Sequence, residues 1–231
     1  MQHVKGLIFD YGGTLDTNGV HWFHIFRQVY ARYLPSRTEE QLREAYVYAE
    51  RYLATHRVIE PDDDFLAMLR KKVALQVGQL AAASSVDMES IAVDCDAMVR
   101  ANMRQTHRVL DALSVRYPMV LVSNFYGNIH AVLRSYGLDG YFMKVIESAI
   151  VGVRKPDPRI FSLGVEALGL QPEEIVVVGD SYGKDIVPAH LLGCRTVWLK
   201  GQGWNASDEP SNVMCADMVV GNLDEVVSLL S

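Results

Sequence analysis

Apolar residues recur with two different periods along the chain, and the change of period divides it into two parts. Between about residues 17 and 104 they recur every three to four positions, which is typical of amphipathic helices. Pro35 and Pro61 interrupt this pattern. The predicted helices of this part cover residues 21–33, 38–55, 62–79 and 87–103.

Short runs of branched apolar residues dominate the rest of the chain and alternate with helical segments. Such runs between helices indicate a mostly parallel sheet that is covered by helices on both faces. The predicted strands are 4–9, 119–122, 144–146, 175–178, 196–199 and 218–220, and the predicted helices are 128–136, 158–168, 185–192 and 224–230. We therefore expect an α/β protein with a core of residues 1–16 and 105–231 and a four-helix cap, residues 17–104, inserted after the first strand.

Charge and cysteine content argue against several classes of function. With 22 Lys and Arg against 28 Asp and Glu, the net charge is −6, and no basic cluster is present, so we expect neither nucleic acid nor an anionic membrane as a partner. Three distant cysteines argue against a disulfide framework or a zinc cluster. The start of the chain is too short and too soon interrupted by Asp10 for a secretory signal, and no run reaches the roughly 18 apolar residues of a membrane helix. We expect a cytoplasmic protein.

Polar residues gather where the predicted strands end. Those at the carboxyl ends of the first four strands, or in the loops that follow, are Asp10, Ser123, Asn124, Lys155, Asp180 and Asp185. Because the carboxyl ends of parallel strands meet at one edge of a sheet, we expect these side chains to lie close together. Carboxylates, a hydroxyl, an amide and a cation at one edge indicate a site for an anion and a hard divalent cation.

These residue types suit phosphoryl transfer. Asp10 can act as a nucleophile that forms an aspartyl phosphate. Mg²⁺ prefers oxygen ligands, and Asp10 with Asp180 supplies them, Asp185 being a further ligand or a partner of the ligands. Lys155 would neutralise the phosphoryl oxygens and keep Asp10 ionised.

Two segments can supply further donors to the phosphoryl oxygens. Ser123 offers a hydroxyl, with the amide of Asn124 beside it, and the turn Gly12-Gly13-Thr14 offers backbone N–H groups. The two glycines of this turn permit the close backbone approach that an anion cradle demands.

Four segments, in this order, resemble the four motifs of the haloacid dehalogenase-like (HAD) hydrolase superfamily: DYGGTLD, LVSN, VRKPDPRIF and VVVGDSYGKDI. The resemblance spans nearly the whole chain, and the insertion after the first motif resembles the helical cap of this family. It implies a Rossmann-like core, a Mg²⁺-dependent aspartyl-phosphate mechanism in most members, and a mobile cap. By position, it implies Asp10 as the nucleophile, Ser123 as the phosphate-binding hydroxyl, Lys155 as the charge-stabilising lysine, and Asp180 and Asp185 as the acids of the fourth motif.

One position departs from the family pattern. Phosphatases of this family usually carry an Asp two residues after the nucleophile, as general acid for the leaving group and then as base for water, and this chain has Gly12 there. Losing such a group typically costs about 10²–10⁴ in rate. The resemblance also implies that the backbone carbonyl at this position binds Mg²⁺. Glycine keeps that carbonyl, so Gly12 remains a predicted metal ligand.

Four explanations for Gly12 stay open. The substrate can have a good leaving group, such as that of an acyl phosphate. Another group, Asp16, His21 or His24, can replace the acid. The protein can bind Mg²⁺ and a phosphorylated ligand without turnover. Finally, family members that cleave C–Cl or C–P bonds also lack this Asp, but the former work without Mg²⁺, and the latter need a cap lysine, which the stretch between Asp10 and Lys71 lacks.

The sequence therefore favours a HAD-like hydrolase with Mg²⁺ as its cofactor and a small phosphorylated metabolite, an ester or an anhydride, as its substrate. Turnover would be slow unless another group replaces the acid. The alternative is a catalytically silent protein that binds Mg²⁺ and a phosphorylated ligand on the same scaffold.

Overall fold

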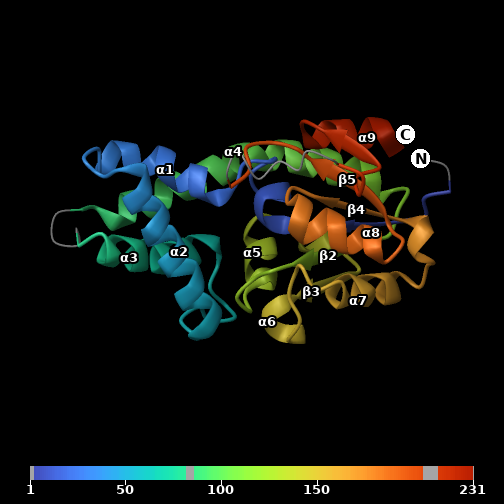
Figure 1. Cartoon of the computed structure of the whole chain (residues 1–231), viewed down its shortest axis with the longest axis horizontal. Helices are drawn as coiled ribbons and strands as arrows, with labels where there is room; N and C mark the ends of the chain where they lie inside the picture. Colours follow the sequence, from blue (N-terminus) through green and yellow to red (C-terminus); the bar gives the residue numbers. More distant parts are fainter. Residues whose placement is uncertain (1–2, 82–85, 205–212, 231) are drawn as a thin grey trace.

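The computed structural model describes residues 3–81, 86–204 and 213–230 of the chain. Its centre is a sheet of six parallel strands in the order β3-β2-β1-β4-β5-β6 (Figure 1). The strands are β1 (Gly6–Phe9), β2 (Met119–Ser123), β3 (Lys144–Glu147), β4 (Ile175–Gly179), β5 (Arg195–Leu199) and β6 (Met218–Val220). The predicted α/β fold is confirmed.

The central strands are buried on both faces, which explains why their sequences are continuous apolar runs. Every residue of β1, β2 and β4 is buried. On one face, Ile8 and Val177 pack in a cluster with Phe161 of α7 (Arg159–Leu168). On the other face, Phe9 belongs to a larger apolar cluster that continues into the helices between β1 and β2.

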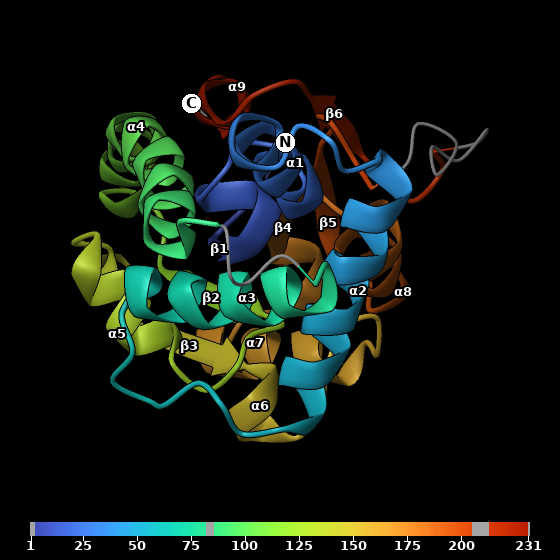
Figure 2. The ribbon, with the colours of Figure 1, turned by 90° about the vertical axis from the view of Figure 1, so that its left-hand side faces the viewer.

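The helices between β1 and β2 are α1 (Trp22–Tyr33), α2 (Glu39–Thr55), α3 (Phe65–Gln79) and α4 (Met88–Ser114). The side chains of Thr38, Asp64 and Asp87 accept hydrogen bonds from the first turns of α2, α3 and α4, which explains where these helices begin. Helices α1–α3 lie together at one end of the molecule (Figure 1). Seen from that end, α2 and α3 cross in front of the sheet (Figure 2).

Helix α4 is longer than predicted. It continues past residue 103 to Ser114, so the predicted boundary between residues 104 and 105 falls inside one unbroken helix. The extension has a physical reason: the helix contains neither glycine nor proline, and the buried Val109, Leu110 and Leu113 continue its apolar period. This last part of α4 packs against α9 (Leu223–Leu230), beside the sheet.

The other α-helices are α5 (Ile129–Ser135), α6 (Ser148–Val151) and α8 (Val187–Leu191). The described residues also form the helical turns η1 (Tyr11–Leu15), η2 (Asp139–Tyr141), η3 (Pro172–Glu174) and η4 (Tyr182–Ile186). Helix α6 was not predicted, because four residues are too few for a helical period to be recognised. Within the ranges that the structure describes, no helix combines the length and the apolar character needed to cross a lipid bilayer.

The segment that enters α1 is held against the segment that follows β5. Val20 and Gln202 form an isolated parallel bridge, and the His21 N–H donates to the Gln202 carbonyl at 2.8 Å. Gly201 makes this approach possible, because a Cβ at that position would overlap the backbone of Gly19. The entry to the helical segment is thereby fixed close to the edge of the sheet that carries the strand ends.

Replacing Gly201 with alanine should push these two segments apart. The added Cβ meets backbone rather than a flexible side chain, so we expect Gly201→Ala to lower the free energy of unfolding by about 1–3 kcal/mol in chemical denaturation. Gly203→Ala is the matched control, because a Cβ there meets no heavy atom within 4 Å. It should change the free energy of unfolding by less than about 0.5 kcal/mol, and equal stability of the two variants would contradict the close approach.

Candidate active site

The turn after β1 positions Asp10. Its side chain is buried, and its N–H donates to the Val178 carbonyl at 3.0 Å, which ties the end of β1 to β4. Three residues later, Gly13 adopts a φ of +94°, and a Cβ there would overlap the Asp180 carboxylate. Glycine combines this left-handed backbone with that approach, so the second glycine of the turn is needed to bring Asp180 near Asp10.

Lys155 lies between two carboxylates from different loops. Its Nζ is 2.5 Å from an Asp10 oxygen and 2.6 Å from an Asp185 oxygen, and all three side chains are buried. Burial opposes the charge of Lys155, but the charges of Asp10 and Asp185 outweigh burial, so the pKa of Lys155 is raised. Lys155 is therefore a charged ammonium at neutral pH, held directly beside Asp10.

Asp180 joins this cluster from the end of β4. The Thr14 hydroxyl lies 3.3 Å from an oxygen of Asp10 and 3.3 Å from an oxygen of Asp180, and it accepts a hydrogen bond from the Asp180 N–H at 3.0 Å. Oxygens of Asp10, Asp180 and Asp185 all lie within 4.8 Å of one another. Asp10 therefore meets two acids, Asp180 and Asp185, that come much later in the sequence.

A divalent cation fits this set of donors. Burial, followed by the charges of Asp10 and Asp185, raises the pKa of Asp180 well above its ordinary value. Burial, partly offset by Lys155, raises the pKa of Asp185 to about 6. A cation among the three carboxylates would relieve their repulsion, and a set of oxygen donors suits Mg²⁺.

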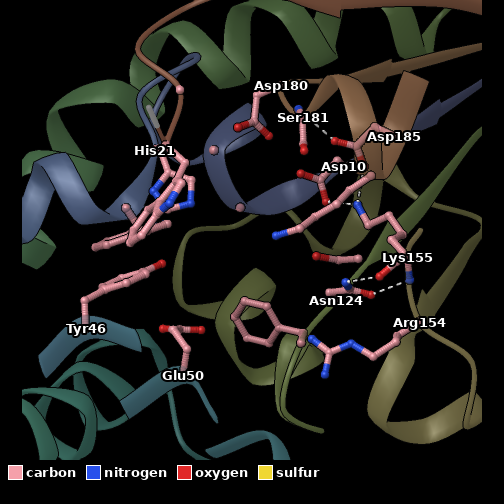
Figure 3. A pocket seen from close by; sticks show the side chains of 18 of the residues that line it. Asp10, His21, Tyr46, Glu50, Asn124, Arg154, Lys155, Asp180, Ser181 and Asp185 are labelled. Atoms are coloured by element: carbon pink, nitrogen blue, oxygen red, sulfur yellow. Dashed lines mark hydrogen bonds and ion pairs between the residues drawn. The ribbon is translucent and has the colours of Figure 1, made fainter. Parts of the chain in front are cut away.

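Ser123 and Asn124 reach the same edge from the end of β2. Ser123 is buried and lines the pocket described below. The Asn124 side-chain amide forms two hydrogen bonds with the backbone of Lys155 (Figure 3). Its Nδ2 donates to the Lys155 carbonyl at 3.0 Å, and its Oδ1 accepts from the Lys155 N–H at 2.8 Å. Asn124 thus holds the segment that carries Lys155.

Nearly all the residues singled out from the sequence line one pocket of about 1400 Å³ between the strand ends and the helices α1–α3. They are Asp10, Gly12, Gly13, Ser123, Asn124, Lys155, Asp180 and Asp185. Thr14 is fully buried and is not part of the pocket wall. Figure 3 shows the acids and Lys155 on one side of the pocket, with His21, Tyr46 and Glu50 facing them from the other.

The helical side of the pocket contains a buried ion pair that we did not predict. The Lys72 ammonium lies 2.5 Å from a Glu50 oxygen and 3.0 Å from the Tyr126 hydroxyl, which donates to the other Glu50 oxygen at 2.5 Å. Burial opposes the charge of Lys72, but Glu50 outweighs burial, so the pKa of Lys72 is raised. The ion pair with Glu50 favours the ammonium form of Lys72, which is not nucleophilic, and this weakens the C–P alternative, which needs a Schiff-base lysine. One signal was available: Lys72 falls on the buried face of α3, next to Val73.

His21 lies at the entry to α1 and lines the pocket. Its Nδ1 accepts a hydrogen bond from the Phe23 N–H at 3.2 Å and so caps the helix, which leaves the proton of the neutral ring on Nε2. Burial lowers the pKa of His21 to about 4, and the positive charge of Lys184 adds to the shift. His21 is therefore neutral at pH 7.

Comparison with known proteins gives a consistent result. Residues 4–193 match the family model of haloacid dehalogenase-like hydrolases. A phosphoserine phosphatase from Thermus thermophilus is 41% identical over 90 residues, which are 39% of this chain and 34% of that protein. A phospholysine phosphohistidine inorganic pyrophosphate phosphatase from Xenopus laevis is 31% identical over 142 residues, 58% of this chain and 52% of that protein.

The fold also matches solved structures over its whole length. The crystal structure of a dehalogenase with an intermediate complex has a TM-score of 0.67 at 18% sequence identity, covering 99% of this chain and 98% of that chain. At this identity the likeness concerns the fold. The two curated relatives are matched over a third to about half of their own length.

The depressed pKa of His21 predicts an acid-sensitive contribution to stability. In the unfolded chain a histidine takes up a proton near pH 6.5, whereas folded His21 resists protonation until about pH 4. Stability from this group is therefore complete above pH 6.5 and is lost as the pH falls toward 4. We expect His21→Asn, which keeps a capping side chain, to gain up to about 3 kcal/mol of unfolding free energy relative to wild type between pH 7 and pH 4.

Chemical denaturation at several pH values measures this difference. His190→Asn, on the exposed end of α8, is the control and should follow the wild-type curve. Parallel curves for wild type and His21→Asn would show that His21 is not the group concerned.

Proposed function

The chain belongs to the haloacid dehalogenase-like hydrolase family, and on that premise we propose that it is a Mg²⁺-dependent phosphohydrolase of small phosphorylated metabolites, with Asp10 as its nucleophile. One observation carries the proposal: Lys155 is buried within 2.6 Å of both Asp10 and Asp185, beside Asp180, in the wall of a large pocket. Burying charges costs several kcal/mol per ion. Such a cluster at the mouth of a sheet supports a catalytic role.

In the first step, an Asp10 oxygen attacks the phosphorus in line with the bond to the leaving oxygen and forms an aspartyl phosphate. Lys155 binds a phosphoryl oxygen and balances the charge that develops there. Ser123 and the Gly12 N–H donate hydrogen bonds to the other oxygens, whereas the Gly13 N–H already donates to Asp16 Oδ1 at 2.7 Å and Thr14 lies outside the pocket wall. In the second step, water attacks the aspartyl phosphate, phosphate is released and Asp10 is restored.

Asp10, Asp180 and Asp185, with the Gly12 carbonyl, would hold the metal. When bound, Mg²⁺ supplies positive charge that offsets the repulsion between the Asp10 carboxylate and the phosphoryl oxygens. Lys155 and Asn124 keep Asp10 in place by the contacts described above.

We further propose that residues 17–104 act as a cap that contacts the rest of the substrate, on a Rossmann-like core of residues 1–16 and 105–231. The pocket wall opposite Asp10 supports this division, because it comes from α1, α2 and α3 and contributes His21, Tyr46 and Lys72. Side chains of this wall would then select the substrate.

The names of the two relatives described above support phosphate rather than halide chemistry, since each is called a phosphatase. The likeness to a dehalogenase concerns the fold. Asp180 and Asp185 also favour a metal-dependent phosphatase, because their oxygens lie with that of Asp10 within 4.8 Å of one another and suit a divalent cation.

A second candidate, a silent protein that binds Mg²⁺ and a phosphorylated ligand, is favoured by one observation. Gly12 has no side chain to act as general acid, and a Cβ built there meets no heavy atom within 4 Å. If no other route to leaving-group departure exists, the site would bind its ligand without turnover.

We expect Asp10→Asn to reduce phosphohydrolase activity by at least about 10³-fold, because the amide is a poor nucleophile. Activity is measured as release of phosphate from acetyl phosphate and from phosphomonoesters with Mg²⁺, and chelation of the metal should abolish it. Asp139→Asn, on the exposed turn η2, is the matched control and should leave the rate unchanged. Full activity of Asp10→Asn would refute the mechanism. An inert wild type whose melting temperature still rises with Mg²⁺ and phosphate would favour the silent binder.

A further inference from the structure

The space left by the missing acid is part of the pocket. Gly12 lines the pocket and adopts an ordinary φ of −78°, and a Cβ there would meet no heavy atom within 4 Å. The position of a Cβ at residue 12 is therefore open. The departing oxygen of a substrate on Asp10 would find no proton donor at this place.

Asp16 does not replace the acid. It is fully buried and does not line the pocket. Burial raises its pKa to about 7, but both oxygens already accept hydrogen bonds: Oδ1 from the Gly13 N–H at 2.7 Å and Oδ2 from the Trp22 indole N–H at 2.7 Å. Asp16 thus holds the turn η1 against the start of α1.

The two histidines near the entry to α1 do not replace it either. His21 is neutral, with Nδ1 committed to the Phe23 N–H, and a neutral imidazole is a very weak acid. The Nε2 of His24 lies 2.7 Å from the Gly203 carbonyl, so its proton is committed to that oxygen. The acids on the helical wall are ion-paired as well: Glu50 with Lys72, and Glu39 with arginines.

Positive charge, in contrast, is in excess around the pocket. Eight Lys and Arg side chains but only five Asp and Glu side chains of the described residues line it, although the whole chain carries a net charge of −6. Two of these cations flank the cluster: Arg154 directly precedes Lys155, and Lys184 directly precedes Asp185. In the part of the chain that the structure describes, neither forms an ion pair with a carboxylate.

The two cations come from different loops of the wall formed by the strand ends. Lys184 belongs to η4, and its charge acts on His21 of the opposite wall. Arg154 lies below Lys155 and Asn124 and extends toward the centre of the pocket (Figure 3). A negative charge that develops on a departing group beside this wall would be attracted to both cations.

We propose that the leaving group departs from this site as an anion, without a proton, and that the substrates are phosphoric anhydrides, either acyl phosphates or diphosphates, rather than alkyl phosphates. This inference rests on the proposed function. It assigns Arg154 and Lys184 the stabilisation of the departing anion, which replaces the missing protonation.

Both steps of this reaction can be written without proton donation from a side chain of the protein. An Asp10 oxygen forms a bond to phosphorus while the bond from phosphorus to the anhydride oxygen breaks, and its electron pair stays on the departing carboxylate or phosphate. Water then attacks the phosphorus of the aspartyl phosphate. The bond to Asp10 breaks, its electron pair returns to the carboxylate, and both protons of the water leave on the product as dihydrogen phosphate.

The first test compares leaving groups. In a series of aryl phosphates, kcat/KM of the wild type should fall steeply as the pKa of the departing phenol rises, and acetyl phosphate and pyrophosphate should be hydrolysed far faster than glycerol 3-phosphate. Gly12→Asp fills open space with a general acid, so it should flatten the dependence and raise the rate on glycerol 3-phosphate by about 10²-fold or more. A flat dependence in the wild type would reveal a proton donor and overturn the proposal.

The second test removes the cations. Arg154→Met and Lys184→Met should each lower the ratio of kcat/KM for acetyl phosphate and pyrophosphate to that for glycerol 3-phosphate by about 10-fold, the effect of losing one hydrogen bond to a charged group. Arg134→Met and Lys144→Met, at exposed positions outside the pocket, are the matched controls and should keep the wild-type ratio. An unchanged ratio in both pocket variants would overturn the role of the cations.

Calorimetry on Asp10→Asn separates this inference from the proposed function. That variant should bind pyrophosphate more tightly than glycerol 3-phosphate, and adding Arg154→Met or Lys184→Met should remove the preference. If the wild type hydrolyses nothing but the binding preference holds, the proposed function fails while the assignment of the cations stands. If glycerol 3-phosphate binds as tightly as pyrophosphate, the inference fails whether or not the wild type is an enzyme.

Discussion

The ammonium of Lys155, buried between Asp10 and Asp185, is the interaction on which the site depends. Without it, two buried carboxylates would face each other and Asp180 with no positive charge, at a cost of several kcal/mol. The three charges come from loops after β1, β3 and β4, and they meet only because parallel pairing sets the distances between those strand ends. Asn124, after β2, completes the arrangement by holding the Lys155 backbone.

The two glycines of the turn after β1 differ in what they contribute to the structure. Gly13, not Gly12, has the backbone that only glycine adopts easily, and the close approach to Asp180 occurs there. Gly12 has ordinary dihedral angles and open space beside it, so its lack of a side chain is a chemical rather than a structural feature. At position 12 the site therefore offers a backbone carbonyl but no side chain.

Much of the fold and the centre of the site could be predicted, because apolar runs mark the buried strands and the polar residues of the site come directly after them. The run at 175–178 is too apolar for anything but a buried strand, and the acid that follows it then lies beside Asp10. The side of the pocket formed by the helices was harder to predict from the sequence. The apolar period of α3 indicates that Lys72 faces inward. It does not indicate that Lys72 contacts Tyr126, which is 54 residues away in sequence. Asp16 stood close enough to Asp10 in sequence to be a candidate acid, and only the path of the chain shows that it turns toward Trp22.

Helix α4 connects the two ends of the molecule as one rod of 27 residues, about 40 Å long. It packs against α3 at one end and against α9 at the other, and α2 lies on the opposite side of the view in Figure 2. Because one unbroken helix packs against both parts of the molecule, it keeps α1–α3 at a fixed distance from the sheet along its axis. Under the proposed function, admission of a substrate would then require release of the contacts of α1 and α2 with the segment after β5, such as that of Arg43 with the Trp204 carbonyl.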